Sequence, residues 1–424
     1  MDNVEAWIVT IGNEIINGVI TDTNRETISR ELRSVGIGTK GMSSVGDDVP
    51  LIADTLAYAM SMAHITVVSG GLGPTEDDKT SEAAARLLGT ELQLDEGQLA
   101  KIEQRFRQWG RPMSVSNRKQ AMFPAGSQPL PNDYGTAPGF LIEKDRRIAL
   151  FFPGIPRELV KMLREQGIPA IQERFGTPRQ VFKTRTFTVY GLSESKLGEI
   201  LSDIAIDEEN YHLAFLPRFP IIRLRMDAKG ATEEEAEAIL ESRRRILDER
   251  IRENIISYDG QSMEVVVTGL VQQRGLTLAL AESITGGMIG EMLTRVPGAS
   301  LSFLGSVVTY SNDMKSSLLG VSRETLSRYG AVSHQCAQEM ALGAKRAGQA
   351  DIGISVTGIA GPEGGSPEKP VGTFYVGLAS TEATLTRGFL LPGTREWVRT
   401  LAAMQALDLL RRHLLGLQLH GKED

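Results

Sequence analysis

The sequence contains one cysteine, Cys336, in a chain of 424 residues. A single cysteine excludes an intramolecular disulfide and a thiolate zinc cluster, and it fits a reducing compartment. No apolar run reaches the roughly 18 residues of a membrane span, and the first residues carry acids where a secretory signal needs bases. An excess of basic charge is also missing, because the formal net charge is -7. We therefore expect a cytoplasmic protein that binds neither a membrane nor nucleic acid.

The rest of the composition is that of an ordinary globular protein. Hydrophobic residues make up 41% and charged residues 23% of the chain, which excludes wholesale disorder and a fibrous repeat. The chain is too long for one hydrophobic core, and its length predicts about two to four domains.

The most informative stretch is AESITGG at residues 281–287, which follows an apolar run from Leu276 to Leu280. We predict a strand that delivers Ser283 to the N-terminus of a helix reaching Met292. Such a helix end offers free N–H groups and a positive dipole, and the two glycines let a ligand approach the backbone. A serine placed there can act as a nucleophile. The alternative is an ordinary N-cap serine followed by glycines that serve packing.

A lysine follows the next predicted strand, which covers residues 305–310. Lys315 lies just beyond the end of that strand, from where it could reach Ser283 on a neighbouring strand end. Desolvation there would lower the pKa of the lysine enough for it to act as a base. Serine with lysine is a known alternative to serine with histidine, and the five histidines offer no better candidate.

Two further elements of the last third can hold a ligand. A predicted strand at residues 352–357 runs into a glycine-rich loop at 358–365, which could supply oxyanion N–H groups or enclose a phosphate. Arg395 lies in the first turn of a long predicted helix, where its guanidinium is placed for a phosphate or a carboxylate.

The first third of the chain predicts a separate site. A strand at residues 6–11 ends in a turn that carries Glu14, and a strand at 65–68 runs into the sequence SGGLGPTEDDKT at 69–80. Three glycines after a strand expose N–H groups to an anion. The acids beside them would repel a phosphate unless a divalent metal bridges the two, and hard oxygen ligands suit such a metal. The alternative is a solvated acidic helix start.

The middle third reads as a small α+β unit. Alternating strands at 185–190 and 221–226 surround a predicted helix at 193–204, and a charged helix runs from Thr232 to Asn254. The chain has no GXXG loop at the turn where an RNA-binding KH domain carries one. The acids at 233–235 also argue against RNA, so we expect a spacer or a dimer element.

Together, these motifs resemble the competence/damage-inducible CinA family. GNEIINGVITDTN, GGLGPTEDDKT, NDYGTAPGF and FPGIPRELVKML resemble its molybdopterin-binding-like domain, and the order of elements in the middle is similar to its KH-like domain. AESITGG, PGAS, VVTYSND with the MK that follows, SVTGIAGPEGG, KPVGT and GTREWVR resemble its C-terminal domain. The resemblance implies an α/β protein with a three-layer α/β domain at 1–175, an α+β KH-like domain at 176–257 and an α/β domain at 258–424.

For the C-terminal domain, the resemblance implies a nicotinamide-nucleotide amidase, which converts nicotinamide mononucleotide (NMN) to nicotinic acid mononucleotide and ammonia without a cofactor. Ser283 would attack the amide carbon, Lys315 would accept its proton, and Tyr310 would orient or relay it. Backbone N–H groups near the glycine loop would stabilise the oxyanion. The implied substrate-binding residues are Gly286, Gly287, Ser300, Thr357, Gly358, Arg395 and Arg399.

For the N-terminal domain, the resemblance implies metal-dependent cleavage of ADP-ribose and related pyrophosphates. Asp77 and Asp78 would hold a divalent metal, namely Mg, Mn or Co. The other implied ligand-binding residues are Glu14, Asn24, Gly70, Gly71, Gly73, Pro74, Thr75, Lys79, Asn132 and Gly135.

The whole chain is then expected to be a homodimeric enzyme of pyridine nucleotide salvage and NAD recycling. Two alternatives stay open. The first domain could carry out molybdopterin or nucleotidyl transfer, or the protein could be a non-enzymatic nucleotide-binding component of competence or the damage response.

Overall fold

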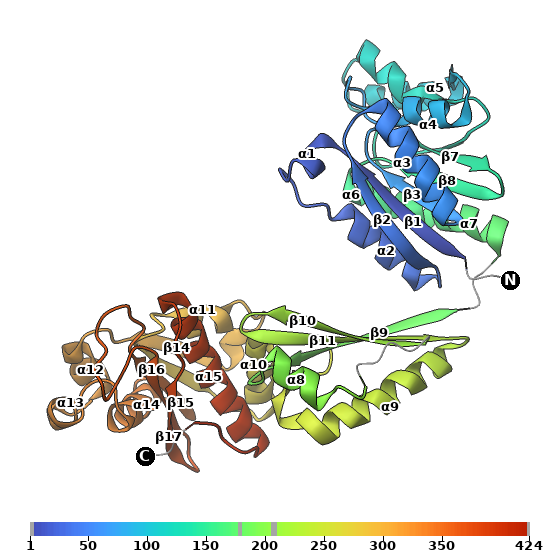
Figure 1. Ribbon diagram of the computed structural model, residues 1–424. Coiled ribbons are helices and arrows are strands. Elements are labelled where there is room, and N and C mark those ends of the chain that lie inside the picture. Colours follow the sequence, from blue (N-terminus) through green and yellow to red (C-terminus); the bar gives the residue numbers. More distant parts are fainter. Residues whose placement is uncertain (1–3, 177–179, 205–209, 422–424) are drawn as a thin grey trace. The chain divides into compact units, whose positions relative to one another are not determined.

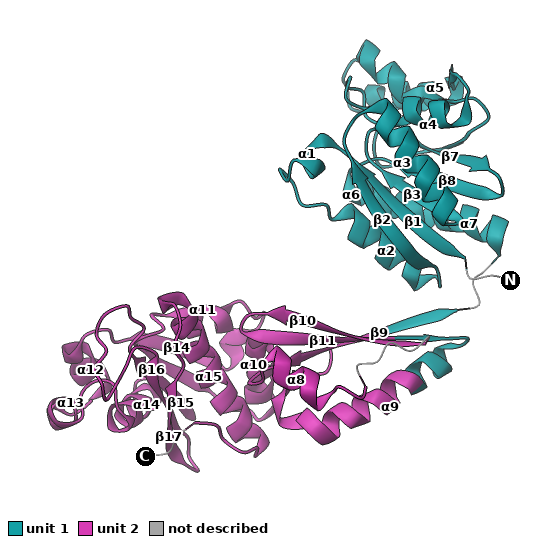
Figure 2. Ribbon diagram, viewed as in Figure 1, with its two compact units in different colours: residues 1–183, 228–238 teal, residues 184–227, 239–424 magenta. Residues whose placement is uncertain are grey.

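The computed structural model describes residues 4–176, 180–204 and 210–421. The chain forms two compact units, shown in Figure 2. The first unit comprises residues 1–183 and 228–238, and the second comprises 184–227 and 239–424. No helix in the described ranges combines the length and the apolar character needed to cross a bilayer.

The first unit is built on a six-stranded sheet in the order β2-β1-β3-β8-β7-β6 (Figure 1). Neighbours among β2, β1, β3 and β8 are parallel, whereas β7 and β6 add an antiparallel edge. The strands are β1 (Glu5–Ile11), β2 (Gly38–Val45), β3 (Ile65–Ser69), β6 (Gln128–Leu130), β7 (Gly139–Lys144) and β8 (Arg147–Phe152). A separate ribbon pairs β4 (Leu92–Leu94) with β5 (Met122–Pro124).

Helices cover both faces of this sheet, which confirms the predicted three-layer arrangement. Side chains alternate along a strand, so Ile8 packs with the core under α2 and α6, and Val9 packs with the core under α3 and α4. Burial on both faces explains why these strands read as continuous apolar runs. The helices are α1 (Asn13–Ile16), α2 (Asn24–Ser34), α3 (Val49–Met62), α4 (Thr80–Leu88), α5 (Glu96–Gln108), α6 (Pro156–Met162) and α7 (Ile168–Phe175).

One edge of this sheet collects the loops that carry the predicted motifs. The parallel strands β1, β3 and β8 all end there, and β7 begins there because it runs antiparallel to β8. The loop at 131–138, which precedes β7, therefore lies at the same edge as the glycine loop that follows β3. Ligands of open α/β sheets bind at such an edge.

The middle segment contains a four-stranded sheet in the order β10-β11-β9-β12 and two helices, in agreement with the predicted α+β unit. Its elements are β9 (Val181–Val189), α8 (Glu194–Ile200), β10 (Tyr211–Arg218), β11 (Ile221–Gly230), α9 (Glu233–Ile251) and β12 (Ile255–Ser257). The predicted change of texture at 177–178 lies outside the described residues.

The C-terminal segment has a five-stranded sheet in the order β14-β13-β15-β16-β17 (Figure 1). Strand β13 pairs in parallel with both β14 and β15, whereas β16 and β17 are antiparallel. Helices α10 and α15 share one core with the sheet, and α12 and α14 share another on the other side of β13. The elements are α10 (Met263–Gln273), β13 (Leu278–Glu282), α11 (Met288–Thr294), β14 (Phe303–Val308), α12 (Asn312–Leu319), α13 (Arg323–Arg328), α14 (His334–Gly348), β15 (Ile352–Gly358), β16 (Thr373–Ala379), β17 (Thr384–Leu390) and α15 (Arg395–Leu415).

Candidate functional site

The carboxyl end of β13 carries the candidate nucleophile. Ser283 is almost buried, and its backbone N–H donates to the Val356 carbonyl of β15 at 3.1 Å. Lys315 belongs to α12, which follows the neighbouring parallel strand β14, and its Nζ lies 3.1 Å from Ser283 Oγ. The structure thus brings the serine and the lysine together from adjacent strand ends.

The surroundings of Lys315 favour its neutral form. The side chain is 1% exposed, and burial lowers the pKa of Lys315 below its usual 10.5, an effect that the nearby Cys336 opposes. Burial in turn raises the pKa of the Cys336 thiol to about 11, so this group is uncharged near neutral pH. Lys315 Nζ donates to the Thr309 carbonyl at 2.7 Å. A neutral amine then keeps a lone pair for the Ser283 hydroxyl proton.

The helix after Ser283 does not offer the free N-terminus that the sequence pattern predicts. Helix α11 begins only at Met288, and the fully buried Glu282 fills its donor groups. The Glu282 carboxylate accepts hydrogen bonds from the N–H groups of Gly287, Ile289 and Gly290, and from the Ser306 hydroxyl. A carboxylate satisfies a helix N-terminus well, so this helix end is closed to a substrate oxyanion.

The amides directly after the serine are the remaining oxyanion donors. Within the described residues, the N–H groups of Ile284 and Thr285 donate to no acceptor. Arg399 donates to the carbonyls of the same two residues, at 3.2 and 2.8 Å. Arg399 does not line the cavity beside Ser283, and its hydrogen bonds fix the loop that follows this serine.

A cavity of about 160 Å³ opens beside Ser283. Its walls include the predicted residues Ser283, Tyr310, Lys315, Thr357, Gly358 and Arg395. They also include Asn312, in the first turn of α12, which the sequence analysis missed because an asparagine in a helix start reads as an ordinary capping residue.

The mouth of this cavity is formed by Arg395 and Tyr310. Arg395 donates to the Gly361 carbonyl at 2.7 Å and to the Tyr310 hydroxyl at 3.2 Å. Tyr310 is 66% exposed, and in the described chain no hydrogen bond joins its hydroxyl to Ser283 or Lys315. The structure places Tyr310 in the cavity wall beside Arg395, and its predicted role in orienting or relaying the proton stays a prediction.

Three predicted glycine and serine contacts lie outside this cavity. Gly286 forms a turn with Ser283, and the N–H of Gly287 is bonded to Glu282. Ser300 is exposed and precedes the amino end of β14, whereas Ser283 follows the carboxyl end of the parallel strand β13. Within this chain Ser300 therefore lies at the edge of the sheet opposite to Ser283.

In the first unit, a cavity of about 390 Å³ lies at the carboxyl edge of the sheet. The predicted residues in its walls are Glu14, Asn24, Gly70, Gly71, Gly73, Pro74 and Asp78. Asn24 donates to Ser69 Oγ at 2.9 Å and to the Gly154 carbonyl at 2.6 Å. Its buried Oδ1 accepts no hydrogen bond from any described residue, which leaves an acceptor for a ligand.

The glycine loop admits only glycine at two of its positions. A Cβ on Gly70, whose φ is +110°, would lie 2.2 Å from the Ile11 carbonyl oxygen, and one on Gly71 would lie 2.2 Å from Thr80 Oγ1. In the part of the chain that the structure describes, the N–H groups of Gly71 and Gly73 donate to no acceptor. They are available to an anion.

Asp47, which the sequence analysis missed, joins the predicted acids at this site. Burial raises the pKa of Asp47, a hydrogen bond from the Asn13 N–H opposes this, and the carboxylates of Glu14, Asp77 and Asp78 raise it further. Among the described residues no three potential ligands converge on one point. Mg²⁺ is commonly held by one or two carboxylates together with substrate phosphates and water, so this excess of negative charge beside an anion loop fits a divalent cation.

The remaining predicted residues of the first unit lie outside this cavity. The N–H and hydroxyl of Thr75 donate to Asp78 Oδ2 at 2.8 and 2.5 Å, so Thr75 orients that carboxylate. Asp77 and Lys79 do not line the cavity. Asn132 and Gly135 line a different cavity, beside α5.

Each of the two units thus carries a cavity at the carboxyl edge of an α/β sheet, one with a glycine loop and carboxylates and the other with a buried Ser–Lys pair. These features define a multidomain α/β protein with two candidate sites. The chain belongs to the CinA family. It is 40% identical to a CinA-like protein of Geobacter metallireducens over 96% of this chain and 99% of that protein. A CinA-like protein of Geobacter sulfurreducens is 38% identical over 96% of this chain and 98% of that protein.

The family profiles match three successive segments. Residues 7–173 match the "Probable molybdopterin binding domain", residues 184–257 the "Damage-inducible protein CinA KH domain" and residues 260–414 the "CinA C-terminal domain". A solved structure of the competence/damage inducible protein CihA from Agrobacterium tumefaciens is 36% identical, covers 37% of this chain and 97% of its own, and has a TM-score of 0.35.

Proposed function

We propose that this protein hydrolyses the carboxamide of NMN, with Ser283 as nucleophile and Lys315 as base. The observation that supports this most is the 3.1 Å separation between the lysine Nζ and the serine Oγ, in a place where the lysine is 1% exposed. Its two hydrogen-bond partners in the described chain, Ser283 and the Thr309 carbonyl, are both uncharged. Neither partner carries a negative charge that would favour the protonated amine.

The reaction follows from these groups. Ser283 Oγ bonds to the amide carbon while its proton moves to Lys315 Nζ, and the N–H groups of Ile284 and Thr285 hold the oxyanion. The lysine then returns the proton to the amide nitrogen, the C–N bond breaks and ammonia leaves. Water attacks the resulting ester with Lys315 again as base, which releases nicotinic acid mononucleotide and restores Ser283.

The two arginines near this site should affect different kinetic parameters. Arg395 lines the cavity and would bind the 5′-phosphate, so Arg395→Ala should raise the KM for NMN about 30-fold with a smaller effect on kcat. Arg399 holds the loop that carries the oxyanion donors, so Arg399→Ala should lower kcat about tenfold with little change in KM. Steady-state kinetics of both variants test this. Equal effects of both changes on KM would contradict the assignment.

The amidase rate should depend on the protonation of Lys315. The folded pKa of Lys315 is lowered by burial, so raising the pH converts the ammonium to the neutral base, and kcat/KM should rise with a midpoint below 10.5. The profile is best measured above about pH 7, where the substrate phosphate is already doubly ionised. A value of kcat/KM that falls as the pH rises over this range would contradict the assignment of Lys315 as the base.

We also propose that the first unit cleaves ADP-ribose or a related pyrophosphate with the help of Mg, Mn or Co. Asp78, which lines the cavity, and the neighbouring Asp77 are the residues that would hold the metal, and Asp47 adds negative charge near them. When bound, the metal would neutralise phosphate charge and activate water. Among the groups of the chain itself, the N–H groups of Gly71 and Gly73 would hold a phosphate.

The two proposed activities can be separated in one preparation. Ammonia release from NMN should persist in a chelator, because the Ser–Lys mechanism uses only protein groups, whereas cleavage of ADP-ribose to AMP and ribose 5-phosphate should stop. Asp78→Asn should remove the second activity and leave the first, and Ser283→Ala should do the reverse. Failure of wild type to release ammonia would overturn the amidase proposal.

A further inference from the structure

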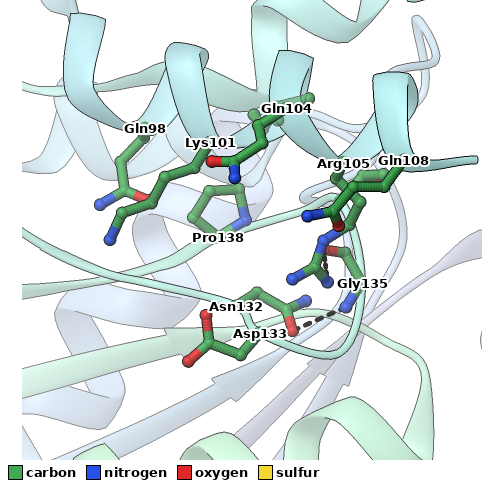
Figure 3. Close-up of a pocket in the computed structure, with 11 residues that line it drawn as sticks. Gln98, Lys101, Gln104, Arg105, Gln108, Asn132, Asp133, Gly135 and Pro138 are labelled. Atoms are coloured by element: carbon green, nitrogen blue, oxygen red, sulfur yellow. Dashed lines mark hydrogen bonds between the residues drawn. The ribbon is translucent and has the colours of Figure 1, made fainter.

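A cavity of about 270 Å³ lies in the first unit between α5 and the loop at 131–138 (Figure 3). We call it the α5 cavity. Its loop wall is fixed by hydrogen bonds, because Asn132 Oδ1 accepts the N–H groups of Tyr134 and Gly135, each at 2.9 Å. Arg105 of α5 donates to the Gly135 carbonyl at 2.7 Å and so ties the helix to the loop. The cavity is therefore a built feature of the fold rather than a gap between mobile parts.

The helix wall of the α5 cavity presents hydrogen-bond donors that have no partner. Gln98, Lys101 and Gln104 all line it, from the side of α5 that faces the loop in Figure 3. Among the described residues, the Lys101 ammonium and the Gln104 side-chain amide form no hydrogen bond or ion pair, and neither does the side-chain amide of Gln98, which is only 8% exposed. A ligand placed here would meet several unused donors at once.

The α5 cavity lies next to the glycine-loop cavity. Thr136 lines both cavities. Asn132, in the wall of the α5 cavity, donates to Glu158 Oε2 at 2.7 Å, and Glu158 lines the glycine-loop cavity. The α5 cavity, at about 270 Å³, is smaller than typical ligand pockets, which begin at ~300 Å³, whereas the glycine-loop cavity, at about 390 Å³, lies at the low end of that range. One extended ligand along the sheet edge fits this arrangement better than two separate small ligands.

The lining of the α5 cavity suits the hydroxyl groups of a sugar. Lys101 and Arg105 carry positive charge there, Arg105 is already bonded to the Gly135 carbonyl, and Asp133 supplies one carboxylate. That carboxylate accepts hydrogen bonds from hydroxyl groups. Sugar hydroxyls also accept hydrogen bonds from the lysine and the glutamine amides. Ile102 and Pro138 add apolar contact for a ring.

We propose that the α5 cavity binds a ribosyl arm of the pyrophosphate substrate whose phosphates bind at the glycine loop. This inference rests on the proposed pyrophosphate cleavage and assigns the substrate class of that site, a pyrophosphate diester with at least one ribosyl group. Lys101, Gln104 and Asp133 are the specificity-determining contacts, and they act on binding rather than on the bond that breaks.

The test is the kinetics of ADP-ribose cleavage by the double variant Lys101→Ala/Gln104→Ala, which changes two exposed side chains. We expect the KM for ADP-ribose to rise about tenfold and kcat to stay within about twofold of wild type. Arg107→Ala is the matched control, because Arg107 is exposed on the same helix and does not line the cavity. Competitive inhibition by ADP then shows which ribose of ADP-ribose occupies the α5 cavity. ADP contains only the adenosine ribose, so its Ki should rise in the double variant only if that ribose binds in the α5 cavity.

Unchanged KM in the double variant, or the same rise in Arg107→Ala, would overturn the inference while wild-type cleavage is intact. If wild type does not cleave ADP-ribose, the proposed activity fails, and calorimetric titration of ADP-ribose decides the subsite. Binding that weakens about tenfold in the double variant would support the subsite. Equal binding by both proteins, or none by either, would overturn it.

Discussion

Ser283→Ala and Lys315→Ala should each lower the rate of ammonia release from NMN by about 10⁴-fold or more. The first change removes the atom that bonds to the substrate carbon, and the second removes the only base within hydrogen-bond distance of Ser283 Oγ in the described chain. The losses should not add, because the two residues act in one proton transfer. The double variant should therefore be about as slow as either single variant.

Ser300→Ala is the matched control for this experiment. It removes the same hydroxyl from an exposed residue at the opposite edge of the same sheet. We expect its rate of ammonia release to stay close to that of wild type. A loss in Ser300→Ala as large as that in Ser283→Ala would contradict the placement of the site at the carboxyl end of β13.

Asp408→Asn should produce the largest loss of stability, lowering the free energy of unfolding of the second unit by about 3–5 kcal/mol. Asp408 is 1% exposed and accepts hydrogen bonds from Arg411 and Arg412 on α15, each at 2.8 Å. Both guanidinium groups are also 1% exposed and donate to the Glu253 carbonyl before β12. When Asp408 is neutral, the buried Arg411 and Arg412 keep carbonyl oxygens as partners, and the only carboxylate left near them is that of the half-exposed Glu253. Buried charges without a charged partner are costly.

Urea unfolding at neutral pH measures this effect. Trp397 reports on the second unit if Trp7 and Trp109, the other two tryptophans, are replaced by phenylalanine. Glu291→Gln is the control, because Glu291 pairs with Arg295 at the exposed surface of the same unit, where ion pairs contribute little. A shift for Asp408→Asn no larger than that for Glu291→Gln would contradict the role of the buried network.

Continuous apolar runs mark β3 and β13, which are buried along their whole length, and alternation marks β11, so the sequence predicted these strands. Strand β2 was missed for the opposite reason. It lies at an edge of the sheet, and Gly38–Val45 is rich in small and polar residues that are only partly buried. Missing β2 also concealed Asp47, which follows its carboxyl end and reaches the predicted acids only through the pairing of β2 with β1.

The Ser–Lys pair could be predicted because Ser283 directly follows one strand and Lys315 lies near the start of the helix that follows its neighbouring strand. The roles of Glu282 and Arg399 could not. A glutamate next to a serine is expected to be exposed. Glu282 is buried because the first N–H groups of α11 and the Ser306 hydroxyl donate to its carboxylate, and only the fold brings Ser306 to it from the neighbouring strand. Arg399 is one of several arginines on its helix, and only the fold shows that it contacts the loop after Ser283.

The central claim is that the substrate becomes covalently attached to Ser283, and trapping with hydroxylamine tests it most directly. Hydroxylamine added during turnover of NMN in a chelator should capture the acyl group, so that the hydroxamate of nicotinic acid mononucleotide forms at the expense of the acid. Ser283→Ala should form neither product. Ammonia release by wild type without any hydroxamate, together with turnover by Ser283→Ala, would contradict the account.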